Sequence, residues 1–128
     1  MKSRKIKEIL KEHPKWENLT KFLQNFYSNY SAEFILLFGS SAKGNFNYKS
    51  DIDLLIVSNS IEGNYFEKLK KMFDISPGGI DLYIYSLEDF DRMVREFHSI
   101  TLEALSEGIL LYDKGFGETY KKLNDYSF

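Results

Sequence analysis

Cysteine is absent from this chain of 128 residues, and proline occurs only twice. Without a thiol there is no disulfide, no thiolate metal site and no cysteine nucleophile. With only eight glycines besides, the chain has too few chain breakers for a disordered or low-complexity segment. No run of about 18 apolar residues occurs, and the basic start of the chain leads into a mixed charged pattern, so we expect no transmembrane span and no signal peptide. We therefore expect a cytoplasmic protein.

Aromatic residues make up 16% of the chain, and its charges nearly balance. Asp and Glu number 19 against 17 Lys and Arg, which gives a formal net charge of −2, although six of the basic residues lie within residues 2–15. Extended binding to duplex nucleic acid needs a basic domain, so the composition argues against it. A chain of this length buries about two-thirds of its unfolded surface, enough for one core. We expect a single domain over residues 1–128.

The hydrophobic pattern predicts helices that alternate with short strands. A period of 3.6 predicts helices over residues 6–13, 15–30, 66–73, 86–97, 99–107 and 118–126. Apolar runs predict strands over 34–38 and 52–57 that are buried on both faces, and a period of two predicts a strand over 80–85. Residues 109–112 are either a fourth strand or a packed connector. The predicted fold class is α/β or α+β, with a sheet covered by helices.

Three short motifs lie at the ends of the predicted strands. Gly39 and Ser40 follow the first strand, Asp51 and Asp53 open the second, and Asp81 lies near the start of the third. Residues i and i+2 of a strand share a face, so Asp51 and Asp53 project side by side, and Asp81 reaches the same place if the third strand pairs beside the second. Clustered carboxylates repel one another unless a cation lies between them. Carboxylates together with substrate phosphates are the ligands that Mg²⁺ prefers.

The turn at Gly39 predicts a complementary anion site. A glycine after a strand lets the backbone approach a ligand, and the start of a helical turn over residues 40–44 offers backbone N–H groups to an anion. Ser40 adds a hydroxyl donor, and Lys43 lies about one turn further on, where its ammonium could meet a phosphate. Phosphates held here beside a carboxylate-bound Mg²⁺ would form a nucleotide site.

Each motif taken alone also has an ordinary structural explanation. A Gly-Ser pair after a strand can be only a turn, and an Asp-x-Asp can be a solvated strand start. Three further aspartates compete for the role of third carboxylate, but they precede a turn or suit the first turn of a helix. These are Asp74, Asp89 and Asp91. With no cysteine and only two histidines, a transition-metal site is not expected, and we assign His13 and His98 structural roles.

Joined in order, the motifs resemble the signature of a known family. The string FGSSAKGNFNYKSDIDLLIV, followed later by IDLYIY, is similar to that of the DNA polymerase beta-like nucleotidyltransferase superfamily. In length the chain looks like the minimal nucleotidyltransferases (MNT) of that superfamily, which are often encoded beside a helical HEPN-domain partner. The resemblance covers residues 34–57 and 80–85 and, loosely, the tail from Glu103 to Asp113. It implies a nucleotidyltransferase fold, a small mixed sheet of three to four strands flanked by helices.

The resemblance also implies a role for each matching residue. The implied catalytic residues and metal ligands are Asp51, Asp53 and Asp81, and the implied nucleotide-binding residues are Gly39, Ser40 and Lys43. Two Mg²⁺ ions would serve an in-line transfer of a nucleotide, AMP from ATP, to a hydroxyl of a protein or RNA acceptor. Pyrophosphate would leave, and Asp81 would act as general base. The length leaves no room for a separate acceptor domain, so we expect the acceptor on another molecule, and the sequence leaves open whether the chain forms an oligomer.

The chain departs from the family pattern at the phosphate-binding turn. Many members have Arg where this chain has Ser41 and Lys43, so a bidentate phosphate clamp is weaker here. Two functions follow from this. The first is an active enzyme that forms the antitoxin half of a HEPN/MNT toxin–antitoxin module, and the intact carboxylates favour it. The alternative is a non-catalytic nucleotide-binding module that neutralises a HEPN-type partner by occlusion.

Overall fold

Helices and strands alternate along the chain, as the hydrophobic pattern predicts. The computed structural model describes residues 8–127. The elements are α2 (Trp16–Asn29), β1 (Phe34–Phe38), η1 (Ser40–Lys43), β2 (Ile52–Val57), α3 (Tyr65–Ile75), β3 (Ile80–Tyr85), α4 (Leu87–Arg95), α5 (Ser99–Glu107), β4 (Ile109–Asp113) and α6 (Phe116–Ser127). Of the helix predicted over residues 6–13, residues 8–10 are helical and a turn follows, whereas residues 6 and 7 lie outside the described residues. None of the helices in this range is both long and apolar enough to cross a bilayer.

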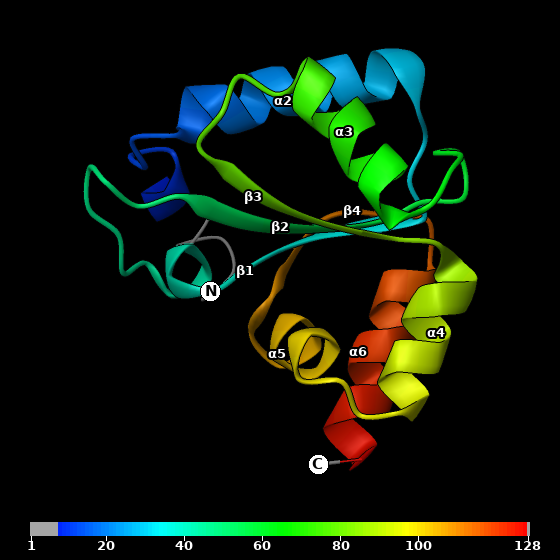
Figure 1. Cartoon of the computed structure of the whole chain (residues 1–128). Coiled ribbons are helices and arrows are strands. Elements are labelled where there is room, and N and C mark those ends of the chain that lie inside the picture. The colour runs from blue at the N-terminus through cyan, green and yellow to red at the C-terminus, as the bar shows by residue number, and fades with distance from the viewer. Residues whose placement is uncertain (1–7, 128) are drawn as a thin grey trace.

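The four strands form one mixed sheet in the order β3-β2-β1-β4. Strand β1 is antiparallel to both β2 and β4, whereas β2 and β3 are parallel. Helices α2 and α3 cover one face of the sheet, and α4, α5 and α6 cover the other (Figure 1). The predicted fold class is therefore confirmed. Residues 109–112, which the sequence left open, belong to the fourth strand, at the edge of the sheet.

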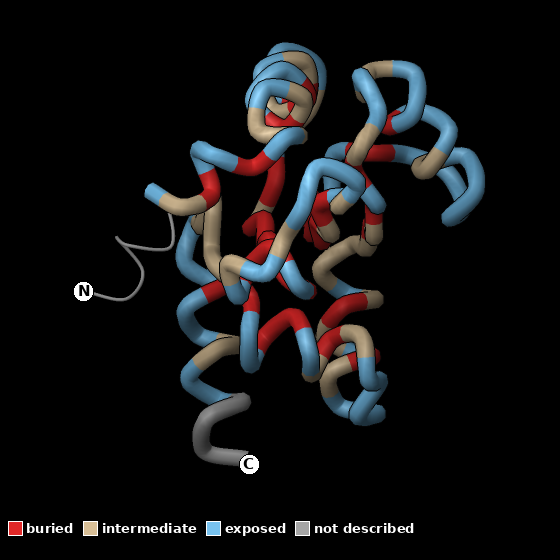
Figure 2. The backbone as a smooth tube through the Cα atoms, turned by 90° about the vertical axis from the view of Figure 1, so that its left-hand side faces the viewer, coloured by how far each residue is buried: buried red, intermediate tan, exposed pale blue. Residues whose placement is uncertain are grey.

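The two faces of the sheet pack against separate hydrophobic clusters. Every residue of β1 is buried, and β2 is buried at all positions except Asp53. Alternate residues of these strands face α2 and α3, as Leu37 and Ile56 do, or the layer of α4 to α6, as Phe34 and Leu55 do. The buried segments run through the centre of the molecule (Figure 2). Burial of each Leu or Phe side chain stabilises the fold by about 1.5–3 kcal/mol. The central strands therefore hold the residues at their ends in fixed positions.

Side-chain caps set the starts of two helices. Asn64 and Glu67 form a capping box at the start of α3, and the Ser86 hydroxyl accepts a hydrogen bond from the Asp89 N–H at 3.1 Å at the start of α4. The backbone N–H of Asp89 is thus used in the helix cap, and its carboxylate forms an ion pair with Arg92 on the same helix.

Candidate active site

Two aspartates lie beside each other where β2 and β3 begin. The parallel register of these strands pairs Asp53 with Asp81, and the antiparallel register of β1 and β2 pairs Phe38 with Asp53. Alternation along β2 places the Asp53 side chain on the face of Leu55, toward the layer of α4, α5 and α6. Asp53 is partly buried and Asp81 is exposed. The sequence predicts that Asp81 reaches Asp53 if the third strand pairs beside the second. The structure shows this pairing.

Burial raises the pKa of Asp53 to about 6 from its ordinary value of 3.8. This value includes, after burial, the negative charges of Asp81 and Glu103 and a hydrogen bond with the Asp81 side chain, while the charge of Asp51 has the smallest effect. All of these causes disfavour a second negative charge at this place. A cation bound between Asp53 and Asp81 would relieve the repulsion, so the pair is chemically suited to a hard divalent ion.

This raised pKa predicts how stability without metal depends on pH. Since the folded chain holds the Asp53 proton more tightly than the unfolded chain does, the group stabilises the fold below about pH 4, and the gain is lost as the pH rises through about 6. In the variant Asp53→Asn, the side-chain amide at this position carries no charge at any of these pH values. After allowance for solvent screening, we expect this variant to be more stable than the unaltered protein by about 1 kcal/mol above that range.

Urea unfolding in the presence of a chelator measures this difference. At about pH 7.5 the variant should unfold at higher urea than the unaltered protein, and at about pH 4 the two midpoints should converge. An equal difference at both pH values would mean that the charge of Asp53 is not the cause.

Asp51 lies just before β2 rather than within it, and its surroundings differ from those of Asp53. Its carboxylate is 3.8 Å from the Lys15 ammonium, and its backbone carbonyl accepts a hydrogen bond from the Ser41 hydroxyl at 3.3 Å. Within the described residues, no group of three or more His, Cys, Asp or Glu side chains is arranged to hold a metal ion. The structure therefore brings Asp53 and Asp81 together and leaves Asp51 at the same end of the sheet, paired with Lys15.

Gly39 connects β1 to η1 in a backbone conformation that few other residues adopt. Its φ is 76° and its ψ is −159°, a region populated almost only by glycine. A Cβ at this position would collide with the Asp53 carboxylate oxygen Oδ2. The missing side chain thus allows the turn to lie directly against Asp53. The phosphate-binding turn and the carboxylate pair, predicted from separate motifs, are in contact.

The helical turn that follows is a short 3-10 helix, as the sequence suggests for residues 40–44. Ser40 is exposed at its start. Lys43 is also exposed, and its ammonium lies 3.0 Å from the Glu107 carboxylate at the end of α5. Exposed ion pairs contribute only about 0.2–1 kcal/mol, so Lys43 could exchange Glu107 for a phosphate at little cost.

Ser41 is buried and makes a contact that the sequence does not reveal. Its hydroxyl lies 3.0 Å from Nε2 of the buried His13, whose Nδ1 accepts a hydrogen bond from the Lys15 N–H at 3.0 Å. Because Nδ1 accepts, the neutral ring carries its proton on Nε2 and donates it to Ser41. Burial lowers the pKa of His13 and so favours this neutral form. His13 thus takes part in a buried hydrogen-bond network, whereas His98 is exposed and pairs with Glu96.

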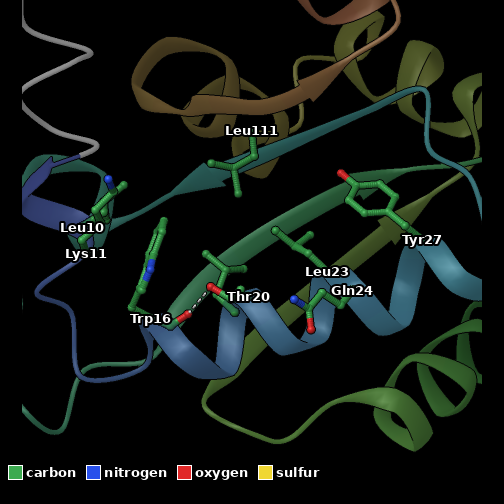
Figure 3. A pocket seen from close by; sticks show the side chains of 9 residues that line it. Leu10, Lys11, Trp16, Thr20, Leu23, Gln24, Tyr27 and Leu111 are labelled. Atoms are coloured by element: carbon green, nitrogen blue, oxygen red, sulfur yellow. Dashed lines mark hydrogen bonds between the residues drawn. The ribbon is translucent and has the colours of Figure 1, made fainter.

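A cavity of about 510 Å³ lies on the other face of the sheet, between α2 and β4 (Figure 3). Apolar and aromatic side chains form most of its wall, among them Leu10, Trp16, Leu23, Tyr27 and Leu111. None of the six predicted site residues, all of which are described, lines it. The wall contains no carboxylate and a single lysine, so this cavity is not suited to phosphoryl chemistry.

Comparisons with known proteins bear on the family and the fold of the chain. The sequence profile of the family described as "Nucleotidyltransferase domain" matches residues 17–111. This span includes all six predicted site residues and leaves out His13 and Lys15. No curated protein sequence matches the chain.

Several solved structures share the fold. A protein from Sulfolobus solfataricus, provisionally described as a nucleotidyltransferase, is 20% identical, with a TM-score of 0.59 over 85% of this chain and 87% of that one. A chain from the crystal structure of a toxin–antitoxin with AMP-PNP is 19% identical, with a TM-score of 0.57 over 86% of each chain. A third match comes from the tri-AMPylated Shewanella oneidensis HEPN toxin in complex with MNT antitoxin. It is 18% identical, with a TM-score of 0.50 over 86% of this chain and 82% of that one.

Proposed function

The chain belongs to the nucleotidyltransferase domain family, and on this premise we propose that it transfers AMP from ATP to a hydroxyl of a protein or RNA acceptor, with Mg²⁺ as cofactor. The observation that carries the proposal is the register of β2 and β3, which pairs Asp53 with Asp81 directly against the Gly39 turn. Two acidic oxygen donors beside an anion-binding turn are what the transfer of a phosphoryl group requires.

The acidic residues at the sheet end fit a divalent metal. Their donors are hard oxygens, and the repulsion that raises the pKa of Asp53 is the repulsion that a cation would remove. In this proposal Asp51, Asp53 and Asp81 hold the metal, with two ions as the expected number. Bound there, Mg²⁺ would neutralise charge on the phosphates and lower the pKa of the acceptor hydroxyl.

The residues of the turn would hold the triphosphate. The left-handed Gly39 brings the backbone up to the carboxylates, and the exposed Ser40 offers its hydroxyl beside them. Lys43 would exchange its exposed pair with Glu107 for a phosphate oxygen. These contacts orient the α-phosphorus toward the acceptor.

The reaction is then a single in-line displacement. The acceptor hydroxyl oxygen forms a bond to the α-phosphorus, and the bond from that phosphorus to the bridging oxygen of the β-phosphate breaks. Pyrophosphate leaves with the bonding electrons. The hydroxyl proton passes to the carboxylate of Asp81, which is exposed and therefore within reach of an acceptor.

The proposed acceptor is a helical HEPN-type protein, with this chain as the antitoxin half of the pair. Two of the similar structures support the proposal, one a toxin–antitoxin with AMP-PNP and the other a tri-AMPylated HEPN toxin in complex with MNT antitoxin. In the second structure, AMP is attached to the toxin. The same chemistry in the present chain would place AMP on its own partner.

Transfer of labelled AMP tests this function. Purified chain, ATP labelled in the α-phosphate and Mg²⁺ are incubated with a HEPN-type protein encoded beside the chain, and we expect the label on that protein. Asp51→Asn combined with Asp53→Asn should remove it. Asp74→Asn is the matched control, because Asp74 is an exposed aspartate on α3, outside the carboxylate pair, and its substitution should leave the label unchanged. Labelling that survives the double substitution would rule out the assignment.

A second candidate function is neutralisation of a HEPN-type partner without catalysis. It is favoured by the contacts that two side chains of the predicted phosphate-binding turn already make. Ser41 is bonded to His13 and Lys43 is paired with Glu107, so neither side chain lies free at the predicted phosphate site. In that case calorimetry would detect binding of both ATP and the partner without turnover. The double substitution at Asp51 and Asp53 would then leave neutralisation of the partner unchanged.

A further inference from the structure

Helix α2 begins in a way that is locally unfavourable. Its N-cap residue is Lys15, which makes no side-chain capping hydrogen bond. Ser, Thr, Asp and Asn are preferred at this position, and the positive end of the helix dipole disfavours a cation there. A local rule broken in this way is most often explained by a function of the residue or by a compensating tertiary contact.

The Lys15 side chain is held along a path that leads to the sheet end. Its methylene stem lies over Gly79, where an added Cβ would come within 2.7 Å of the Lys15 Cδ. The side chain is only 24% exposed, and its ammonium ends 3.8 Å from the Asp51 carboxylate. Gly79 also accepts a hydrogen bond from the Ile52 N–H at 3.0 Å, so the surface beneath the stem belongs to the same strand ends as the aspartates.

The backbone around Lys15 is tied to the site from two sides. On one side, His13 accepts a hydrogen bond from the Lys15 N–H and bonds to Ser41, which in turn donates to the Asp51 carbonyl. On the other side, the Asn18 amide donates to the Gly78 carbonyl at 2.9 Å. Residues 13–18 are therefore positioned by both η1 and the loop that precedes β3.

The negative charges at this end of the sheet favour a further cation, besides the metal and Lys43, when a polyphosphate binds. The three predicted site aspartates and Glu103, whose charge acts on Asp53, gather negative charge here, and Lys43 can meet a phosphate only by giving up its ion pair with Glu107. Among the ion pairs of residues 8–123, only that of Lys15 involves a predicted site aspartate. Its separation of 3.8 Å is beyond a hydrogen bond, so little is lost when the ammonium turns to another partner.

We propose that Lys15 is a phosphate-binding residue of the nucleotide site. It would donate a charge-assisted hydrogen bond to the polyphosphate. Lys15 would thereby supply the positive charge that an arginine brings in many family members at the position of Ser41. The proposal rests on the proposed function, because it needs a nucleotide at the end of the sheet. It also goes beyond the family match, since Lys15 lies outside residues 17–111.

Nucleotide affinity tests this role. The probe is an ATP analogue with a methylene group between the α- and β-phosphorus, which cannot react, and its binding is measured by calorimetry in excess Mg²⁺. Lys15→Met keeps most of the stem and removes the charge, and we expect it to weaken binding about tenfold, the value of one charge-assisted hydrogen bond. Lys15→Arg should bind within about threefold of the unaltered chain. Lys21→Met is the control, an exposed lysine further along α2, and should change nothing.

The outcomes separate this proposal from the one on which it rests. If the unaltered chain fails to bind the analogue, both proposals fall. If it binds the analogue and Lys15→Met binds equally well, only the role of Lys15 falls. Titration with Mn²⁺ alone gives a second measurement, because tighter metal binding by Lys15→Met with unchanged analogue affinity would mean that Lys15 merely screens Asp51. Thermal unfolding of each variant shows that the compared proteins are folded.

Discussion

Asp53→Asn is expected to lower the rate of AMP transfer by at least about a thousandfold, the loss typical of removing one charged group that stabilises the transition state. Asp53 is the residue that the register places between the other parts of the site, with Phe38 on one side and Asp81 on the other. Asn has nearly the same shape but no charge, so the turn at Gly39 keeps its contact. A metal bound at the proposed site would, in contrast, lose a charged ligand that is partly buried.

Single-turnover transfer of labelled AMP measures this loss, and two comparisons make the result specific. Asp74→Asn, on α3, should retain full activity. The stability measurement described above separates loss of activity from loss of folding, because the same Asp53→Asn variant should be more stable than the unaltered chain without metal. An unfolded variant would contradict the stability prediction, and a folded variant that keeps more than about a tenth of the rate would contradict the assigned role.

Gly39→Ala has the second large expected effect, a loss of about 2–3 kcal/mol in the free energy of unfolding. An alanine must adopt a φ of 76° and a ψ of −159°, and its Cβ collides with the Asp53 carboxylate. Relief of that collision moves either the turn or Asp53. Since both belong to the proposed site, we expect transfer to fall at least about a hundredfold, beyond what destabilisation explains.

Gly115→Ala is the matched control for this prediction. Gly115 also has a left-handed φ, 133°, but a Cβ there would meet no atom within 4 Å. This variant should be destabilised by backbone strain alone, by about 1–2 kcal/mol, and remain active. Urea unfolding and AMP transfer are measured on both variants. Equal activity in the two would show that the contact between Gly39 and Asp53 does not matter for the reaction.

The central strands could be predicted to the residue because their side chains leave little choice. Apolar runs bounded by glycine and polar residues predict strands 34–38 and 52–57, and alternation predicts strand 80–85, as observed. Helix ends were less certain. The helix predicted over 86–97 spans Leu87–Arg95, and the one predicted over 66–73 spans Tyr65–Ile75, because caps and packing decide the last turn.

Strand β4 illustrates what a local pattern leaves open. Residues 109–112 are apolar in sequence, which suits both a strand and a packed connector. In the structure they pair with β1 at the sheet edge, with an irregularity between Ile35 and Leu36, and every residue of the strand is partly buried. Only the partner strand, more than 70 residues earlier in the chain, distinguishes the two forms.

The sequence by itself determined the alternation of helices and strands, the residue types of the site and the family, because each depends on spacing along a short stretch of chain. The tertiary structure decided which of those residues meet. Parallel pairing of β2 and β3 sets Asp53 beside Asp81, while packing of residues 13–15 against η1 and the start of β2 pairs Asp51 with Lys15. Such contacts depend on strand register and on segments far apart in sequence, and no local pattern encodes them. For the same reason, the position of Lys15 beside Asp51 is shown by the structure and could not be predicted from the sequence motifs.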